Sequence, residues 1–509
     1  MNIDQMIVLG YLIAVVAFGC WFVFYTRNAD EFMSAGQSIP GWAMGLSIFG
    51  SYISTISFLG NPTDAYAKNW NPLVFALVTP VAAYFAVAFF VPFFRRSGEV
   101  SAYHHLEHRF GPWARTYCVV CFVMLQVVRL GMITQLLASV IAPLFKWDVT
   151  SMIFFLGVLI TIYPLLGGTE GVIWAGVIQA IVLILGVIAC VYYLIAGVPG
   201  GIPEIISVGL AAKDQGPWGK FSLGTFEFNL FVSSFWVVLL QGLNEHTRNF
   251  AIDQSYIQRY ISAKSDKDAA RSVWYGVVLY LPTAFLFFFM GASLFAYVKA
   301  NPGWLPPDTP TKGVFPHFIN TGLPAGLTGL VIAAIASAAM DSNLNCMATL
   351  FLKDIYQRYL RPDCSEKRAM WILHSSTFVF GAMSTLFAIL TLKTPDILST
   401  WWTWGGIASG GILGLFLLGV ICPRTTSSQA AVGVVLGLLV TFWMTLSIPE
   451  VWDLLQIPPE SALAKLRSPF HKLMAPFMGT LVIFVVGAFL GMIAPGPKRS
   501  HEPEKTLAA

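Results

Sequence analysis

The chain alternates long apolar stretches with short polar connections along almost its whole length. About thirteen stretches approach or exceed the roughly 18 apolar residues that cross a bilayer as a helix. They cover residues 3–26, 42–67, 72–94, 114–143, 149–166, 171–198, 225–247, 273–298, 324–352, 369–392, 398–422, 429–449 and 470–494. Each must be a helix, because isolated strands would leave backbone groups unpaired in hydrocarbon. The pattern predicts an all-α polytopic membrane protein.

Composition narrows the function classes. Of the 509 residues, 56% are apolar and 11% are charged, against about 25% charged in ordinary soluble domains. So few charges argue against a soluble enzyme, a nucleic-acid binder and a disordered scaffold. No HExxH or GxSxG motif occurs, so we expect no enzyme activity. The expected partners are a small-molecule solute and the lipid bilayer, with no nucleic acid, as a monomer or an oligomer of unknown size.

The basic residues orient the chain in the membrane. An odd number of spans places the two ends on opposite sides, and Lys and Arg gather on the connections that an outside N-terminus would make cytoplasmic. The first apolar stretch has no basic leader and no small-residue cleavage site, so we predict a retained helix. The sequence predicts a multi-pass protein of the cell (inner) membrane, with its N-terminus outside and its C-terminus cytoplasmic.

The second stretch departs from a simple membrane anchor. Its centre holds hydroxyls and glycines, and Asn61-Pro62 predicts a break in the helix. A broken helix at membrane depth is tolerated only where it lines a cavity or packs on protein. Free carbonyls at such a break coordinate cations, and free N–H groups hold anions. The alternative explanation is that small residues permit close helix packing.

The ninth stretch carries polar side chains that are costly in hydrocarbon. Ser337, Asp341, Asn343 and Asn345 should face the protein interior or water. On a continuous helix, Asp341 and Asn345 share a face, and Ser337 lies on it one turn earlier. This set of hard oxygens suits a small cation or a proton. A polar network that fixes helix packing is the alternative.

Two other spans contain candidate binding groups. Arg129, in the fourth stretch, must pair internally or meet an anionic substrate, whose carboxylate its planar fork can hold. The seventh stretch ends in the cluster Asn244–Phe250, which is unusually rich in ionisable side chains. A helix end that emerges into water would explain that cluster equally well.

Several segments, in order along the chain, resemble the sodium/solute symporter family. They are Ala29–Trp42, His105–Gly111, Tyr163–Gln179, Asp253–Ser265 and Leu344–Tyr356. The resemblance implies a leucine-transporter-type core of two inverted five-helix repeats, with the first and sixth core helices (42–67 and 225–247) discontinuous. The implied parts are a leading helix and entry loop (1–41), a first repeat (42–198), a second repeat (199–449), and a trailing helix and cytoplasmic tail (450–509).

The segment Gln126–Met132 is most similar to the sialic-acid and sugar-acid branch of that family. By position, the resemblance implies a set of substrate contacts on the first, third and sixth core helices. These residues are Ser54, Ser57, Arg129, His246, Asn249 and Phe250.

The resemblance also implies a sodium site, with departures from the family pattern. By position, the backbone carbonyls of Gly50 and Ile53 would bind Na⁺ at the main site, and Asp341 and Ser342 occupy the positions of a second sodium site in the sialic-acid branch. Ser337, one turn before Asp341, is a further candidate ligand. Ala338 and Ala339 replace two expected hydroxyl ligands, and Gly176 replaces an expected acid. We hypothesise that Asp341 supplies the missing charge. The predicted function is a secondary active transporter that couples Na⁺ to symport of a small polar solute, a sugar or sugar acid such as sialic acid. The alternative is a sodium-independent or proton-coupled transporter of the same fold.

Overall fold

The computed structural model describes residues 1–340, 343–392, 404–406, 408–409, 411–454 and 465–497. Almost all of the described residues lie in helices or the short turns between them. The helices are α1 (Ile3–Trp21), α2 (Ala29–Ser34), α3 (Gly41–Tyr52), α4 (Thr55–Ala67), α5 (Leu73–Leu77), α6 (Thr79–Phe85), α7 (Val91–Ser97), α8 (His104–Phe110), α9 (Pro112–Phe145), α10 (Val149–Ala196), α11 (Gly201–Ala211), α12 (Phe235–Ile252), α13 (Gln254–Ser262), α14 (Asp266–Ala300), α15 (Thr311–Thr321), α16 (Leu327–Ala339), α17 (Leu344–Leu350), α18 (Glu366–Leu390), α20 (Ile412–Ile421), α21 (Ser427–Leu446), α22 (Pro449–Leu454) and α23 (Ala475–Ile493). Two π-helical segments continue α6 and α17, over Ala86–Phe90 and Phe351–Leu360.

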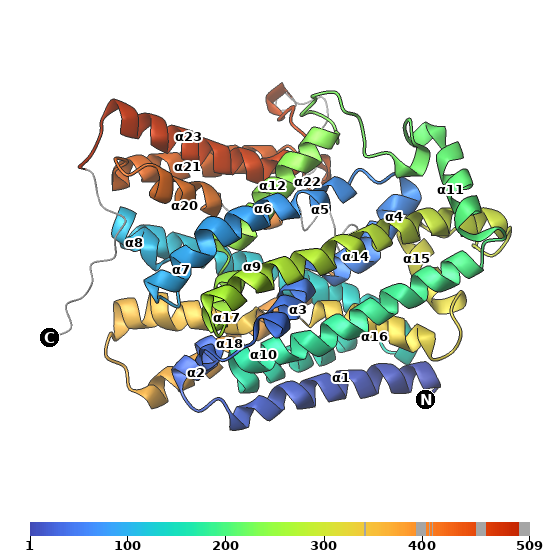
Figure 1. Cartoon of the computed structure of the whole chain (residues 1–509), viewed down its shortest axis with the longest axis horizontal. Helices are drawn as coiled ribbons and strands as arrows, with labels where there is room; N and C mark the ends of the chain where they lie inside the picture. Colours follow the sequence, from blue (N-terminus) through green and yellow to red (C-terminus); the bar gives the residue numbers. More distant parts are fainter. Residues whose placement is uncertain (341–342, 393–403, 407, 410, 455–464, 498–509) are drawn as a thin grey trace.

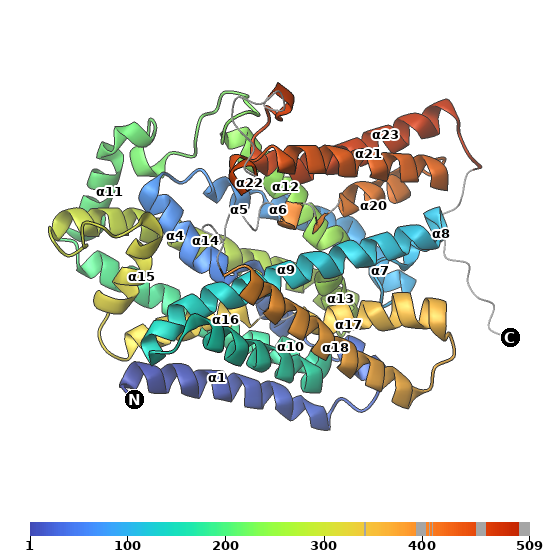
Figure 2. The same cartoon turned by 180° about the vertical axis from the view of Figure 1, so that it is seen from behind.

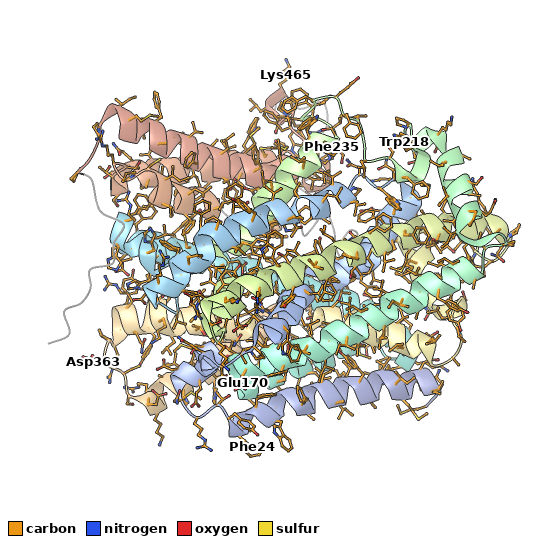
Figure 3. All side chains as sticks on the ribbon, viewed as in Figure 1. Phe24, Glu170, Trp218, Phe235, Asp363 and Lys465 are labelled. Atoms are coloured by element: carbon orange, nitrogen blue, oxygen red, sulfur yellow. The ribbon has the colours of Figure 1, made fainter. Side chains whose placement is uncertain are left out.

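The long helices run side by side, so the bundle has two distinct ends (Figures 1 and 2). The start of α1 lies at the end that carries α11 and α15, whereas α23 finishes at the opposite end, near α7 and α8. Trp218 marks the first end and Asp363 the second (Figure 3). In the described part of the chain, nine helices are long and apolar enough to cross a membrane, or ten if the bent pair α3–α4 is one span.

Fewer helices qualify as spans than the sequence pattern predicted, for identifiable reasons. The predicted spans 149–166 and 171–198 are both present but meet within α10 at Gly168, whose φ of 56° and ψ of −155° interrupt the helix. A Cβ at Gly168 would lie 3.1 Å from Phe32, so only glycine fits this turn against α2. The predicted span 398–422 lies partly outside the described residues, which contain only the short helix α20 there.

The break in the second predicted span lies elsewhere than expected. Helices α3 and α4 meet at Ile53 and Ser54 with a bend of 55°, whereas Asn61 and Pro62 lie inside α4. Ser54 begins α4 as its N-cap, because its hydroxyl accepts a hydrogen bond from the backbone N–H of Ser57 at 3.3 Å. The prediction of a break was right, and the position Asn61–Pro62 was wrong. A proline in a helix removes one N–H donor but does not always end the helix.

Two other predicted helices also differ from the structure. The span predicted at 225–247 begins only at Phe235, where the Ser234 hydroxyl caps α12 by accepting from Val237 N–H at 3.3 Å. Its discontinuity comes at Asp253, whose carboxylate accepts from Ser255 N–H at 3.0 Å and starts α13. The ninth span is not one regular helix, because α16 ends at Ala339 and α17 starts at Leu344. Asp341, which the sequence placed on one face with Ser337 and Asn345, lies outside the described residues.

Candidate solute and cation site

A cavity of about 1720 Å³ lies between α4, α5, α9, α12 and α14. It follows α4 from Ser54 to Lys68, a length of about 20 Å at about 1.5 Å per residue. Its outer part is lined by loop residues that include Asp214 and Lys472, and by the first residues of α15, so it reaches the end of the bundle that carries α11 and α15. Ligand pockets typically measure about 300–1000 Å³, so this cavity has room for a small solute and a vestibule above it.

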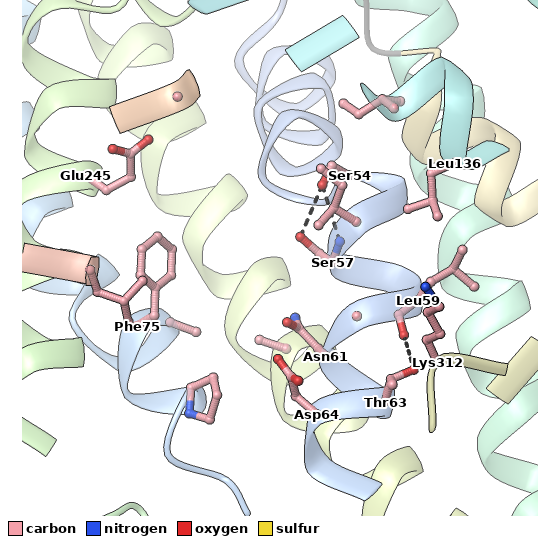
Figure 4. A pocket seen from close by; sticks show the side chains of 18 of the residues that line it. Ser54, Ser57, Leu59, Asn61, Thr63, Asp64, Phe75, Leu136, Glu245 and Lys312 are labelled. Carbon is pink, nitrogen blue, oxygen red and sulfur yellow. Dashed lines mark hydrogen bonds between the residues drawn. The ribbon is translucent and has the colours of Figure 1, made fainter. Parts of the chain in front are cut away.

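The α3–α4 break places two hydroxyls at the inner end of the cavity. Ser54 and Ser57, in the first turn of α4, line the cavity with their oxygens 3.3 Å apart, and both point into it (Figure 4). The first turn of a helix presents unpaired N–H groups and a positive partial charge, which favour anions. The break therefore offers donors to a negatively charged group.

Arg129 reaches the same break from α9. Its Nη2 donates a hydrogen bond to the carbonyl oxygen of Ser51, the second-last residue of α3, at 3.1 Å. This bond uses one of the five N–H donors of the guanidinium, and the half-buried side chain lines the cavity. The structure thus brings together Arg129, Ser54 and Ser57, three of the residues predicted as substrate contacts.

The predicted contacts on α12 lie in different surroundings. Asn249 lines the cavity, and its Oδ1 accepts from Arg248 Nη2 at 2.8 Å. His246 also lines the cavity, but its Nε2 lies 3.0 Å from Thr79 Oγ1 and 2.9 Å from the carbonyl oxygen of Phe75. His246 therefore ties α12 to α5 and α6.

The structure places Phe250 outside the cavity lining. The side chain is fully buried, with its ring 6.0 Å from that of Tyr52 and 5.6 Å from that of Tyr256. Tyr52 in turn stacks on Tyr280 at a centroid distance of 4.7 Å, and Tyr52, Tyr256 and Tyr280 all line the cavity. Phe250 thus supports an aromatic floor below the solute space.

The sequence-based site prediction missed several polar residues of the cavity, among them Glu245 and Gln126. Glu245 lines the cavity from α12, across from Ser54 and Ser57 (Figure 4), and Gln126 lines it from α9. Gln126 Oε1 accepts from Asn343 Nδ2 at 2.9 Å, which links α9 to the segment before α17. The density of ionisable residues in 244–250 was the available signal for Glu245, although it did not tell which side chain faces the cavity.

The predicted cation ligands are only partly described. The carbonyl of Gly50 accepts from Ile53 N–H at 3.2 Å, and the break deprives the last carbonyls of α3 of the partners that a continuous helix supplies. Helix α16 adjoins this break, because Thr55 Oγ1 donates to the carbonyl of Ile335 at 3.1 Å. Asp341 and Ser342 lie outside the described residues.

The remaining side chains predicted for the cation site are buried. Ser337 donates to Ala333 O at 2.8 Å and shares a hydrogen bond of 2.5 Å with the hydroxyl of Tyr11 on α1. Ala338 and Ala339 are buried and supply no side-chain oxygen.

The match with known proteins decides the family. A model of the sodium:solute symporter family matches residues 32–437. The chain belongs to this family. This membership makes the chain a sodium-coupled, multi-pass membrane transporter, which confirms the predicted function class and the predicted use of Na⁺.

Relatives of the symporter include two bacterial proteins with near-complete overlap. The sodium/sialic acid symporter SiaT of Proteus mirabilis is 31% identical over 443 residues, which are 86% of this chain and 88% of that protein. The sodium/sialic acid symporter NanT of Aliivibrio fischeri is 30% identical over 448 residues, with 87% and 88% covered. The human sodium-coupled monocarboxylate transporter 1 is 26% identical over 451 residues, with 87% and 73% covered.

Solved structures confirm the predicted fold. The substrate-bound, outward-open state of a Na⁺-coupled sialic acid symporter superposes with a TM-score of 0.88 at 29% identity, covering 98% of this chain and 99% of that one. Mhp1, a nucleobase-cation-symport-1 family transporter, shares the fold at 12% identity with a TM-score of 0.56, covering 92% of this chain and 95% of its own. The fold is of the leucine-transporter type.

The end of the symporter opposite the cavity mouth is held by a charged network. Arg115 pairs with Asp354 and with Glu107, the latter at 2.8 Å, and Arg358 pairs with Glu107 at 2.6 Å. Burial alone would raise the pKa of Glu107, but hydrogen bonds from the two guanidiniums outweigh it and hold that pKa below its ordinary value. Glu107 is therefore a stable anion that joins α8, α9 and the π-helical end of α17.

Proposed function

We propose that this symporter imports a sialic-acid-like sugar acid together with Na⁺. One observation carries the proposal: a guanidinium, two hydroxyls and the first turn of α4 converge on the inner end of a single cavity. A carboxylate is the group that best satisfies this set, because an arginine fork and helix N–H groups both favour anions. The sialic acid symporters among the relatives support a hydroxylated acid as the solute.

In this proposal Arg129, Ser54 and Ser57 bind the carboxylate, and Asn249 contacts the remainder of the solute. His246 positions α12 through its hydrogen bonds to Thr79 and to the carbonyl of Phe75. Phe250 supports the solute space through Tyr52 and Tyr256 instead of touching the solute.

We also propose where Na⁺ binds. The carbonyls of Gly50 and Ile53 at the end of α3 would hold the ion beside α16, with the oxygens of Ser337, Asp341 and Ser342 as the further ligands predicted from the sequence. Because the solute carboxylate and the cation would both bind at one break, each would favour the other electrostatically. This proximity gives a physical basis for coupling.

The charge distribution supports an orientation. Arg95, Arg96, Arg109, Arg358 and Arg361 belong to the elements at the α8 end of the bundle, and positively charged connections favour the cytoplasmic side. We infer that the α8 end is cytoplasmic and the N-terminus external in the cell membrane. The cavity then opens outward, and closure of the two inverted repeats, 42–198 and 199–449, would expose the solute to the other side.

Uptake by purified protein in proteoliposomes tests the proposal. An inward Na⁺ gradient should drive accumulation of N-acetylneuraminic acid, whereas an equal K⁺ gradient should not. Accumulation driven by a proton gradient without Na⁺ would instead favour the alternative coupling, for which the hydroxyl-free Ala338 and Ala339 are the specific argument. Absence of uptake under every gradient would refute a sugar acid as the solute.

A further inference from the structure

A fixed carboxylate faces the space where an anionic solute is proposed to bind. Glu245 lines the cavity with about a quarter of its side chain exposed, 23%. Arg248, one turn further along α12, donates to both of its oxygens, from Nε at 3.2 Å and from Nη2 at 2.5 Å. The pair holds the oxygens of Glu245 in one orientation.

Arg248, which also lines the cavity, has further partners besides Glu245. Arg248 Nη1 also donates to Asp253 Oδ2 at 3.3 Å, and Nη2 donates to Asn249 Oδ1 at 2.8 Å. Asp253 marks the break between α12 and α13. The guanidinium is therefore bound on several sides, so Glu245 cannot turn without breaking a buried network.

Glu245 retains capacity to accept hydrogen bonds. A carboxylate has about four acceptor positions, and Arg248 occupies two of them. The others are available to donors in the cavity. Hydroxyl donors form charge-assisted bonds to a carboxylate that are about twice as strong as neutral ones.

We propose that Glu245 is a specificity-determining residue that accepts hydrogen bonds from hydroxyl or amide N–H groups of the solute. Arg129, Glu245 and Arg248 all line the cavity, and Arg248 is already paired with Glu245. The solute carboxylate therefore turns toward Arg129, and its hydroxylated part turns toward the remaining acceptor positions of Glu245. The site thereby selects hydroxylated monocarboxylates over plain fatty acids, which offer no hydroxyl donor to Glu245. This inference rests on the proposed function and assigns to Glu245 the contact with the end of the solute opposite its carboxylate.

Substitution Glu245→Gln tests the inference, since glutamine keeps the shape and one acceptor but removes the charge. Binding to purified protein is measured for N-acetylneuraminic acid and for analogues that each lack one hydroxyl. Glu245→Gln should weaken binding of the full solute by about 10- to 100-fold, the loss expected for hydrogen bonds to a charged group. At least one deoxy analogue should bind poorly to the unmodified protein and suffer no further loss in the variant.

Asp64→Asn is the matched control, because Asp64 is another carboxylate that lines the same cavity, on α4 toward its mouth (Figure 4). It should leave the ranking of the analogues unchanged. A merely structural role for Glu245 would lower affinity for every analogue equally, and this result would overturn the inference, as would unchanged affinity for the full solute. If the unmodified protein binds no hydroxylated acid, the proposed function fails as well.

Discussion

Replacing Arg129 with alanine removes the guanidinium that the structure places at the α3–α4 break. In the unmodified protein the fork would form two charge-assisted bonds to the solute carboxylate, beside its bond to the carbonyl of Ser51. Truncating one partner of a buried, hydrogen-bonded charge pair costs about 2–5 kcal/mol. At about 1.4 kcal/mol per factor of ten, the dissociation constant of a sugar acid should rise by about 30- to 4000-fold.

The assay is isothermal titration of purified protein with N-acetylneuraminic acid and with its methyl ester, which lacks the negative charge. The unmodified protein should prefer the acid strongly, and Arg129→Ala should lose most of that preference because the ester never used the guanidinium. Lys68→Ala is the control: it removes a cation from the mouth of the same cavity and should leave the preference intact. Equal affinity of the acid for Arg129→Ala and the unmodified protein would refute the assignment of Arg129.

Three further predictions concern stability. Ser54→Ala removes the N-cap of α4 and should cost about 1 kcal/mol, observed as a lower thermal unfolding midpoint; an unchanged midpoint would contradict the capping role. Gly168→Ala forces a side chain into a backbone conformation that glycine tolerates, and should reduce the yield of folded protein in size-exclusion chromatography far more than Gly10→Ala, where a Cβ meets open space. Glu107 has a lowered pKa in the folded state, so its stabilisation should be complete above its unfolded pKa of about 4.3 and be lost as the pH falls through the folded value. Glu107→Gln should reduce the loss of unfolding free energy at acid pH, measured by chemical unfolding at several pH values. The same loss in the variant and in the unmodified protein would count against a stabilising role of the ion pairs.

The apolar stretches predicted the helices well because bilayer thickness fixes their length. They did not predict whether consecutive helices are joined. The predicted spans 149–166 and 171–198 both occur, but the only interruption of α10 between them is the non-helical backbone of Gly168. The number of helices counted from hydropathy therefore depends on the backbone conformation of single glycines, which the sequence does not reveal.

Helix breaks were harder to locate than to foresee. Polar residues in 42–67 correctly predicted an interruption, but proline was the wrong marker, since Pro62 stays helical and Ser54 caps the new helix. Likewise, α12 begins at the capping residue Ser234 although apolar residues precede it. Local capping by serine hydroxyls outweighed both the proline and the hydropathy in these places.

Some site residues could be predicted from the sequence, whereas others depend on how their helix is rotated in the fold. Arg129 could be named in advance because a charged group in hydrocarbon must face a cavity or a partner, whereas Ser54 and Ser57 were implied by the resemblance to the symporter family. On α12, His246, Asn249 and Phe250 were the predicted contacts, yet Glu245 lines the cavity and Phe250 does not. The rotation of a helix about its axis depends on tertiary packing, here on the bonds of His246 to Thr79 and Phe75.

Reciprocal binding of Na⁺ and solute tests the central claim most directly. If both occupy the α3–α4 break, the dissociation constant of N-acetylneuraminic acid should fall as Na⁺ increases, and that of Na⁺ should fall by the same factor as the sugar acid increases, because coupling free energies are mutual. Calorimetric titration of each ligand at several fixed concentrations of the other measures both factors. Equal, sizeable factors are the predicted result; a solute affinity that does not change between zero and saturating Na⁺ would contradict the account.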